Sequence, residues 1–285
     1  MSVAEIWKGA PAAAALSEDL KGRTAQLRQR GILPTLAILR VGERPDDISY
    51  ETGAMKRCEK IGLGVKCFTL PSDCSREALL DTIRQINDDP GIHGCLLFRP
   101  LMDRALEAEA CALLAPEKDV DGCTAGSLAA VFTGKGAGFP PCTAQACIEL
   151  LDHYGVDLTG KRAVVIGRSL VIGRPVAMML QARNATVTIC HTKTADLGAV
   201  CREADILIAA AGRAGVVGAE CAAPGQIVLD VGIHQRADGT LCGDVDLAAV
   251  EPIVRAVTPV PGGVGAVTTA VLAKHVVEAA EARRV

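Results

Sequence analysis

A glycine-containing turn between two contrasting segments is the clearest candidate for ligand chemistry. The segment KRAVVIG, Lys161–Gly167, predicts a buried strand, and it is followed by Arg168 and Ser169. Gly173 then precedes Pro175, a residue suited to the first turn of a helix. A strand, turn and helix in this order direct the amides of the helix N-terminus at a phosphate. The spacing is not G-x-G-x-x-G, so an ordinary strand-to-helix turn is the alternative.

The end of the next predicted strand indicates which nucleotide would bind. An NAD site usually places an acidic residue there, where it hydrogen-bonds the ribose 2′-OH. This chain has CHTKT, Cys190–Thr194, which contains no carboxylate, and Arg168 is expected nearby. The arrangement suits a 2′-phosphate and predicts NADP rather than NAD. A solvated loop at His191 and Lys193 is the alternative.

Two further loops have compositions that ligand sites use. The segment PVPGGVG, Pro259–Gly265, contains three glycines, and a backbone without Cβ atoms can approach a flat ligand closely. The segment PEKDVDG, Pro116–Gly122, offers Asp119 and Asp121. A tight turn explains the first segment equally well, and in the second segment a carboxylate is more often a turn former than a ligand.

The surrounding sequence predicts an α/β protein with two domains. The chain has 285 residues, more than the roughly 100 to 150 that are most frequent in one domain. Aromatic residues make up only 2%, so aliphatic side chains must fill the core. Predicted strands alternate with predicted helices, an order typical of parallel sheets. The expected strands lie at Thr35–Gly42, Val65–Pro71, Gly91–Pro100, Lys161–Gly167, Ala185–Cys190, Ala204–Gly212 and Gln226–Gly232, and one expected helix is Ser49–Ile61, ended by Gly62.

Charge, hydropathy and cysteine spacing argue against several classes of partner. The net charge is -3 and no long run of like charges occurs, so we expect no nucleic-acid and no membrane partner. No stretch approaches the ~20 apolar residues that span a bilayer, and we expect a cytoplasmic protein. The twelve cysteines include no C-x-x-C, and the closest pair is Cys142 and Cys147. Buried reduced thiols and no metal site are therefore predicted.

Nine segments from about residue 35 to the C-terminus occur in the order and at the spacing of one known family. They are LRVGERPDDISY, PEKDVDG, FPPCTAQACIELL, GKRAVVIGRSLVIGRPVA, ATVTICHTKT, ADILIAAAG, GQIVLDVGI, GDVD and TPVPGGVG. On these segments the chain resembles the methylenetetrahydrofolate dehydrogenase/cyclohydrolase (FolD) family. The resemblance implies a homodimer with a folate cleft between two domains. It also implies a catalytic domain of residues 1–121, completed by the C-terminal helix 266–285, and a Rossmann-like NAD(P)-binding domain of residues 122–265.

The resemblance implies roles for individual residues as well. Tyr50 matches the tyrosine that stacks on the substrate, and Asp121 matches the acid that hydrogen-bonds the pterin. The other substrate-binding positions that it implies are Phe98, Pro100, Gly262, Gly263 and Thr268. On the nucleotide side, Gly167, Arg168 and Ser169 match the phosphate turn, Thr192 a hydroxyl beside the 2′-phosphate, and Ile233 a nicotinamide contact.

The chain departs from the family pattern at the catalytic lysine. The family has Tyr, three residues and then the Lys, with a Gly twelve places after the Tyr. Tyr50 and Gly62 keep this spacing, so Ala54 stands at the catalytic position. The resemblance implies that Lys56 is the family's second, non-catalytic basic position. It cannot take the catalytic position, because two residues turn a helical side chain by roughly 200°.

Further departures lie in the segments expected around the folate. The family's Val-Gln-Leu-Pro-Leu-Pro is here Leu97–Met102, so the Gln that hydrogen-bonds the catalytic Lys is replaced by Phe98, and the following Leu by Arg99. Gly-Pro-Met-Thr is here GAVT at Gly265–Thr268, and Asp46–Asp47 replaces Ala-Ser. The paired loss of Lys and Gln indicates a concerted change.

The two family reactions place different demands on this site. Oxidation of 5,10-methylenetetrahydrofolate removes a hydride and needs no general base, whereas cyclohydrolysis needs an acid-base group. We therefore expect NADP-dependent oxidation of a tetrahydrofolate-bound one-carbon unit, with cyclohydrolase activity lost or weak. Two alternatives stay open: a bifunctional enzyme that uses Arg99 or Lys56 as another base, and a non-catalytic binder of folate or nucleotide.

Overall fold

The computed structural model describes residues 4–283, which form two compact units. The six-strand unit contains residues 4–13 and Thr143–Thr268, and the three-strand unit contains Ala14–Cys142 and residues 269–283. The boundaries between these units differ from those of the predicted domains, which are 1–121 with 266–285 and 122–265. The functional boundaries of the domains stay a prediction. Residues 1–3 and 284–285 of those domains lie outside the described residues.

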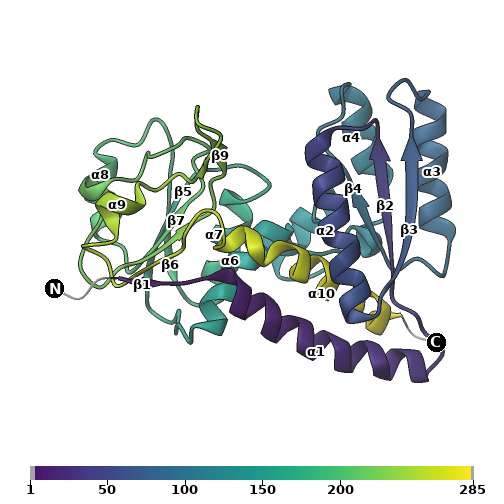
Figure 1. The fold of residues 1–285 in the computed structure, drawn as a ribbon, viewed down its shortest axis with the longest axis horizontal. Helices are drawn as coiled ribbons and strands as arrows, with labels where there is room; N and C mark the ends of the chain where they lie inside the picture. The colour runs from purple at the N-terminus through teal and green to yellow at the C-terminus, as the bar shows by residue number, and fades with distance from the viewer. Residues whose placement is uncertain (1–3, 284–285) are drawn as a thin grey trace. The chain divides into compact units, whose positions relative to one another are not determined.

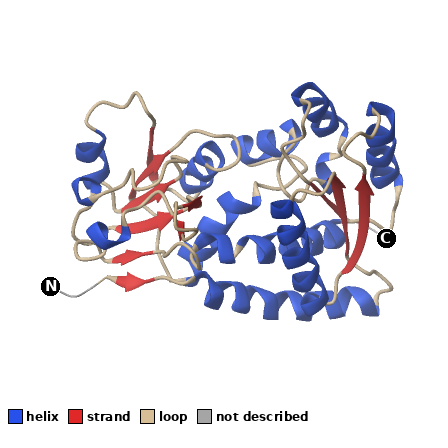
Figure 2. Ribbon diagram, turned by 45° about the horizontal axis from the view of Figure 1, so that its top comes forward, coloured by secondary structure: helices blue, strands red, loops and turns tan. Residues whose placement is uncertain are grey.

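Within the described residues, the six-strand unit contains a parallel sheet of order β1-β11-β8-β7-β5-β6 (Figure 2). β5 pairs with β6 on one side and with β7 on the other, so the direction of chain winding reverses at β5. Open α/β sheets bind ligands beside such a reversal, at the carboxyl ends of the strands. The strands are β1 (Glu5–Ile6), β5 (Arg162–Ile166), β6 (Thr186–Cys190), β7 (Ile206–Ala209), β8 (Ile227–Asp230) and β11 (Ala256–Val257).

The central strands β7 and β8 of this sheet are short, apolar or nearly apolar runs. All four residues of β7 and of β8 are buried, as expected for parallel strands that are covered on both faces. The other elements of the unit are α6 (Cys142–His153), α7 (Gly173–Ala182), α8 (Leu197–Arg202), α9 (Leu247–Val250), the short helices η2 (Ala219–Cys221) and η3 (Val264–Ala266), and the antiparallel pair β9 (His234–Gln235) and β10 (Leu241–Cys242).

The three-strand unit is built on a parallel sheet of order β3-β2-β4 (Figure 1). Its strands are β2 (Thr35–Val41), β3 (Gly64–Leu70) and β4 (Gly94–Leu97). Leu39 and Leu97 share a core cluster with Leu79, Ile83 and Ala110, which come from two helices. The helices of the unit are α2 (Pro45–Ile61), α3 (Arg76–Asp88), α4 (Arg104–Leu113), η1 (Pro116–Lys118) and α5 (Ala125–Thr133), while α1 (Gly9–Gln29) and α10 (Thr268–Ala282) extend into it from the other unit.

Gly62 ends α2 as the sequence predicts. It has a φ of 90°, a left-handed conformation that favours glycine, and its amide donates to the carbonyls of Cys58 and Glu59. The expected α/β class, the parallel strands and the Rossmann-like sheet are confirmed.

Candidate nucleotide and substrate site

The turn after β5 brings backbone into unusually close contact. Gly167 has a φ of +125°, and a Cβ at this residue would lie 2.0 Å from the carbonyl oxygen of Ala210. A Cβ on Gly173 would lie 2.2 Å from the carbonyl oxygen of Gly167. Only glycine therefore fits either position, and the first turn of α7 can pack directly against the end of β5. We call this close-packed turn, with Gly167 and Gly173, the glycine cradle. It would let backbone amides approach a phosphate closely.

Ser169 fixes the loop that precedes α7. Its hydroxyl oxygen accepts a hydrogen bond from the Ile172 amide at 3.1 Å, and its carbonyl accepts one from the Arg174 amide at 3.0 Å. Pro175 lies in the first turn of α7, where a missing amide proton costs nothing. The predicted strand, turn and helix are confirmed.

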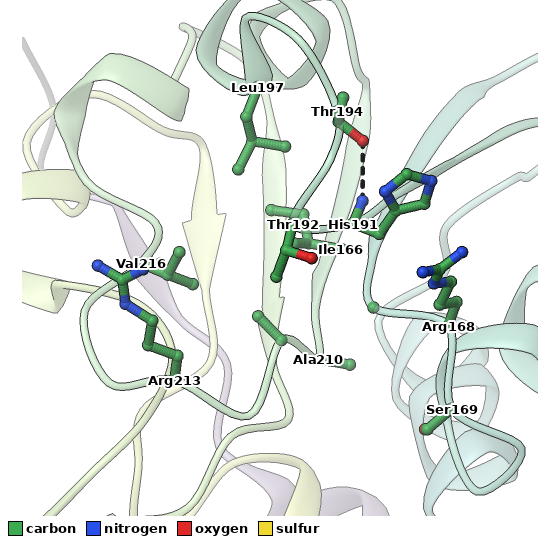
Figure 3. A pocket seen from close by; sticks show the side chains of 12 residues that line it. Ile166, Arg168, Ser169, His191, Thr192, Thr194, Leu197, Ala210, Arg213 and Val216 are labelled. Carbon is green, nitrogen blue, oxygen red and sulfur yellow. Dashed lines mark hydrogen bonds between the residues drawn. The ribbon is translucent and has the colours of Figure 1, made fainter.

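A pocket of ≈ 430 Å³ opens at the carboxyl ends of β5, β6 and β7 (Figure 3). Arg168 and His191 lie on one side of the pocket and Arg213 on the other. Two guanidinium groups at one cavity create a positive potential that suits a phosphorylated ligand. The remaining lining residues are Ile166, Gly167, Ser169, Thr192, Thr194, Leu197, Ala210, Ala211 and Val216.

The loop after β6 has an internal order that the sequence did not reveal. The Thr194 hydroxyl accepts a hydrogen bond from the His191 amide at 2.9 Å, which Figure 3 shows, and His191 Nδ1 accepts one from the Lys193 amide at 3.1 Å. His191 and Thr192 therefore line the pocket, while Lys193 is exposed and outside the lining set.

Asp244 orders the third side of this pocket. Its fully buried carboxylate accepts hydrogen bonds from the amides of Ala211 (2.5 Å), Gly212 (3.0 Å) and Arg213 (3.0 Å). His234 Nε2 lies 2.7 Å from the same carboxylate. Asp244 was considered in the sequence analysis only as part of GDVD, and Arg213 was not singled out. The available signal was the position of Arg213 just beyond a strand end.

A second pocket in the same unit, of ≈ 480 Å³, contains the predicted loop residues Gly262 and Gly263 together with Thr268. A Cβ on Gly263 would lie 2.5 Å from the carbonyl oxygen of Pro259, so this loop also depends on glycine. Ile233 lines the pocket and its side chain is 68% exposed, which leaves it open to a ligand.

Asp230 lies at the base of this second pocket and connects it to the β10 region. Its carboxylate accepts hydrogen bonds from the amides of Gly232 (3.0 Å), Asp244 (2.9 Å) and Val245 (3.0 Å). Burial nonetheless raises the pKa of Asp230 to about 6.

Tyr50 and Ala54 lie on one face of α2 in the three-strand unit, and Phe98 follows β4 in the same unit. Tyr50 and Ala54 are one turn apart on α2, and Ala54 is 1% exposed. The rings of Tyr50 and Phe98 meet edge to face with centroids 6.1 Å apart. Lys56 is exposed, whereas Ala54 is buried, so the two residues lie on different faces of the helix as predicted.

Asp121 and Arg99 form a second group in the three-strand unit. Arg99 Nη2 lies 3.9 Å from Asp121 Oδ2. Burial raises the pKa of Asp121 to about 6, and the Arg99 charge opposes this rise. Pro100 is exposed on the same loop. The predicted folate residues thus divide between the units, with Gly262, Gly263 and Thr268 in the other one.

In the part of the chain that the structure describes, no three His, Cys, Asp or Glu side chains are grouped to bind a metal ion. All twelve cysteines are free thiols. None of the helices within residues 4–283 is both long enough and apolar enough to cross a membrane.

Comparisons with known proteins agree over both units. Residues 7–121 match the model of the tetrahydrofolate dehydrogenase/cyclohydrolase catalytic domain, and residues 141–284 match that of its NAD(P)-binding domain. The bifunctional protein FolD of Carboxydothermus hydrogenoformans is 52% identical over 98% of each chain.

Solved structures with the same fold include two enzymes of this kind. The bifunctional FolD of Campylobacter jejuni superposes with a TM-score of 0.94 at 36% identity, covering 98% of this chain and 99% of that one. The Trypanosoma brucei enzyme, complexed with NADP cofactor and an inhibitor, has a TM-score of 0.91 at 32% identity, with 99% and 98% covered.

Proposed function

The chain belongs to the tetrahydrofolate dehydrogenase/cyclohydrolase family, and from this premise we propose that it oxidises 5,10-methylenetetrahydrofolate to 5,10-methenyltetrahydrofolate with NADP+. The principal support is the glycine cradle at Gly167 and Gly173 beside a pocket with two arginines. The relatives' names, which state a bifunctional protein, agree with a dehydrogenase.

Arg168, Ser169 and Thr192 would hold the nucleotide phosphates in this proposal. The loop after β6 presents His191 and Thr192 but no carboxylate, which suits the doubly charged 2′-phosphate of NADP and leaves the ribose diol of NAD without its usual acidic partner. Ile233 would contact the nicotinamide. When bound, the nicotinamide accepts the hydride at C4.

The protein's contribution to the oxidation is orientation and electrostatics. The carbon that loses the hydride is flanked by two nitrogens, which share the resulting positive charge, so no proton has to leave. Tyr50 would support the folate ring by stacking, and the Asp121 carboxylate would accept its N–H groups. The uncharged side chain of Ala54 places no cation beside the carbon as positive charge develops.

We further propose that cyclohydrolase activity is lost or weak. This reaction adds water to the methenyl carbon and delivers a proton to the leaving nitrogen, and a positioned acid-base group is typically worth 10²- to 10⁴-fold. Ala54 is 1% exposed and carries no such group, and Phe98 contacts Tyr50 instead of supporting an amine. The relatives are named bifunctional proteins, and the Campylobacter jejuni structure is named a dehydrogenase/cyclohydrolase, so this part of the proposal separates the chain from them.

Neither basic residue considered as a substitute suits the role. Lys56 lies on the exposed face of α2. Arg99 lies near Asp121, and a guanidinium, with its pKa above ~12, does not act as a general base near neutral pH. These observations favour a monofunctional dehydrogenase over a bifunctional enzyme with another base.

Two assays on one preparation test the proposal. NADP+ reduction that depends on methylenetetrahydrofolate is expected, with slower reduction of NAD+. Hydrolysis of methenyltetrahydrofolate should proceed near the uncatalysed rate, and enzyme-dependent hydrolysis comparable to that of a relative with the lysine would contradict the loss. Binding of folate and NADP without any turnover would instead identify a non-catalytic binder.

We also propose a cytoplasmic homodimer. Light scattering should then give twice the chain mass of 29.5 kDa at micromolar concentration, and a single-chain mass would contradict the dimer.

A further inference from the structure

The Arg99 guanidinium is a positive charge close to the Asp121 carboxylate. Its Nη2 lies 3.9 Å from Asp121 Oδ2, and the two side chains are 23% and 26% exposed. An ion pair at this depth is shielded from solvent more than a surface pair, so it has a larger effect on the ionisation of its partners.

The backbone at Arg99 and just after it is anchored. The Arg99 carbonyl accepts a hydrogen bond from Arg44 Nη2 at 3.2 Å, and Arg44 itself binds Asp47 through two hydrogen bonds of 2.8 and 2.7 Å. Two residues later, the Leu101 amide donates to Glu107 Oε2 at 2.6 Å. The loop that presents the guanidinium is therefore fixed at two points.

The segment that presents Asp121 is fixed as well. The Val120 carbonyl accepts a hydrogen bond from Cys142 Sγ at 3.2 Å and lies 2.8 Å from His275 Nδ1. The neighbouring Asp119 accepts the amides of Cys123 (2.9 Å) and Thr124 (2.7 Å). The two residues just before Asp121 are therefore held by contacts that do not use the Asp121 carboxylate.

The charge balance around Asp121 depends on few groups. Burial raises the pKa of Asp121 to about 6, the nearby Asp119 adds to the rise, and Arg99 and the Cys142 thiol oppose it. The titratable groups that act on Arg99 are Cys123, Asp121, Cys111 and Glu107. Arg99 is therefore the cation that opposes protonation of Asp121.

Arg99 also carries an energetic cost that calls for an explanation. Its Nε is buried and has no hydrogen-bond partner within the described chain. A buried donor without an acceptor costs about 1–3 kcal/mol. Such groups are rare in native structures and are found where function opposes stability.

We propose that Arg99 is a positioning residue that keeps Asp121 ionised and oriented to accept paired N–H groups of the substrate ring. This inference rests on the proposed function, in which Asp121 receives the folate. An ionised carboxylate accepts two N–H donors side by side, whereas a protonated one turns one oxygen into a donor and loses the match. Arg99 extends the useful range of the site toward lower pH.

The pH profile of Arg99→Leu tests this role in the whole enzyme. We expect KM for methylenetetrahydrofolate to rise about twofold near pH 7 and about tenfold near pH 5, where the loss of the ionised carboxylate is largest, with kcat changed far less. The midpoint of the acid limb of kcat/KM should move up by roughly one pH unit. Arg99→Lys should restore most of the midpoint. Arg84→Leu, which removes an exposed arginine paired with Asp81, is the matched control.

A measurement without folate separates this inference from the proposed function. In protein labelled with 13C at aspartate carboxyls, Asp121→Asn identifies the Asp121 signal, and its titration midpoint should be higher in Arg99→Leu than in the wild type. If the wild type has dehydrogenase activity and the Asp121 midpoint is unchanged in Arg99→Leu, only the proposed role of Arg99 is overturned. A shifted midpoint in a protein without dehydrogenase activity overturns the proposed function and the substrate role together. If Arg99→Leu fails to fold, Arg99→Gln replaces it.

Discussion

At position 54 a methyl group lies one helical turn from the Tyr50 ring, and the Phe98 ring lies against that phenol. An amine at position 54 would point to the same side as Tyr50, because residues four apart share a helix face. Burial would lower the pKa of such an amine toward neutrality, where it can both donate and accept a proton. In the proposed function, the loss of cyclohydrolase activity would therefore be traced to this side chain and its hydrogen-bond partner.

The double substitution Ala54→Lys with Phe98→Gln is expected to raise methenyltetrahydrofolate hydrolysis by roughly ten- to a hundredfold, since it supplies the acid-base group that the site lacks. Steady-state hydrolysis without nucleotide measures the gain. Met55→Lys, which adds an amine on the exposed part of the same helix, should leave hydrolysis unchanged. No gain in the double variant would show that the site differs in more than this pair.

Arg168→Ala is expected to raise KM for NADP+ by about ten- to a hundredfold, because hydrogen bonds to a charged group contribute about 1.5–3 kcal/mol. KM for NAD+ should change little, since NAD+ has no 2′-phosphate. Initial rates with the two nucleotides measure the ratio. Arg174→Ala removes a neighbouring exposed arginine outside the pocket lining and serves as the control. Equal losses with both nucleotides would place Arg168 at another phosphate.

At the scale of elements, two buried carboxylates hold loops that strands and helices alone do not order. Asp244 gathers the amides of residues 211–213 after β7, and Asp230 gathers those that follow β8 and β10. The sheet supplies the strand ends, and these carboxylates determine the paths of the loops that leave them. Their hydrogen bonds compensate in part for the cost of burying charge.

The buried Asp230 predicts a pH-dependent contribution to stability. Its pKa is raised to about 6 in the folded protein, above the ~3.9 of an unfolded chain, so the folded state binds the proton more tightly. The stability that Asp230 contributes is greatest below about pH 4 and falls as the pH rises through 6.

Between pH 5 and 7.5 the free energy of unfolding of the wild type should therefore fall by about 1 kcal/mol, whereas that of Asp230→Asn should not show this fall. Thermal melting of both proteins at the two pH values gives the difference, with the exposed Asp73→Asn as the control. Parallel changes in the variant and the wild type would contradict a raised pKa.

At the scale of the whole molecule, the chain passes between its two units three times, and each end of the chain takes part in a unit formed mainly by distant residues. β1 pairs with β11, and Trp7 stacks on Tyr154 with ring centroids 4.3 Å apart. Trp7 is 2% exposed, and its amide donates to the Val257 carbonyl at 2.9 Å. The first residues of the described chain therefore complete the sheet that positions the nucleotide pocket.

Trp7→Ala is expected to destabilise the six-strand unit by about 3–5 kcal/mol, the cost typical of deleting a large buried aromatic side chain. Trp7→Phe should cost less, because it keeps a ring against Tyr154. Thermal melting in the presence and absence of NADP+ measures the effect. Phe132→Ala, in the other unit, removes an aromatic ring that is 74% exposed and should shift the melting temperature little. Equal shifts for Trp7→Ala and Phe132→Ala would contradict a structural role for the stack.

Local patterns in the sequence were sufficient for the α/β class, the strands β2 to β8 and the helix end at Gly62, but not for the two-residue strands β1, β9, β10 and β11. Strands appear as apolar runs and the end of α2 as a glycine, and both depend on neighbours within a few residues. The spacing from Tyr50 to Gly62 likewise placed Ala54 and Lys56 on different faces of α2, because helical geometry is periodic. The phosphate turn was predictable for the same reason, since the strand, the glycines and the helix start are contiguous.

Contacts between residues far apart in the sequence were decided only by the tertiary structure. Asp244 orders residues 211–213, Arg213 lies across a pocket from Arg168, and Arg99, which follows β4, approaches Asp121, which follows η1. Burial is also a tertiary property, and it moves the pKa values of Asp121 and Asp230 to about 6. The sequence by itself determined which side chains this protein has at its site, whereas packing decided which of them meet and in what charge state, because distance and desolvation depend on the whole fold.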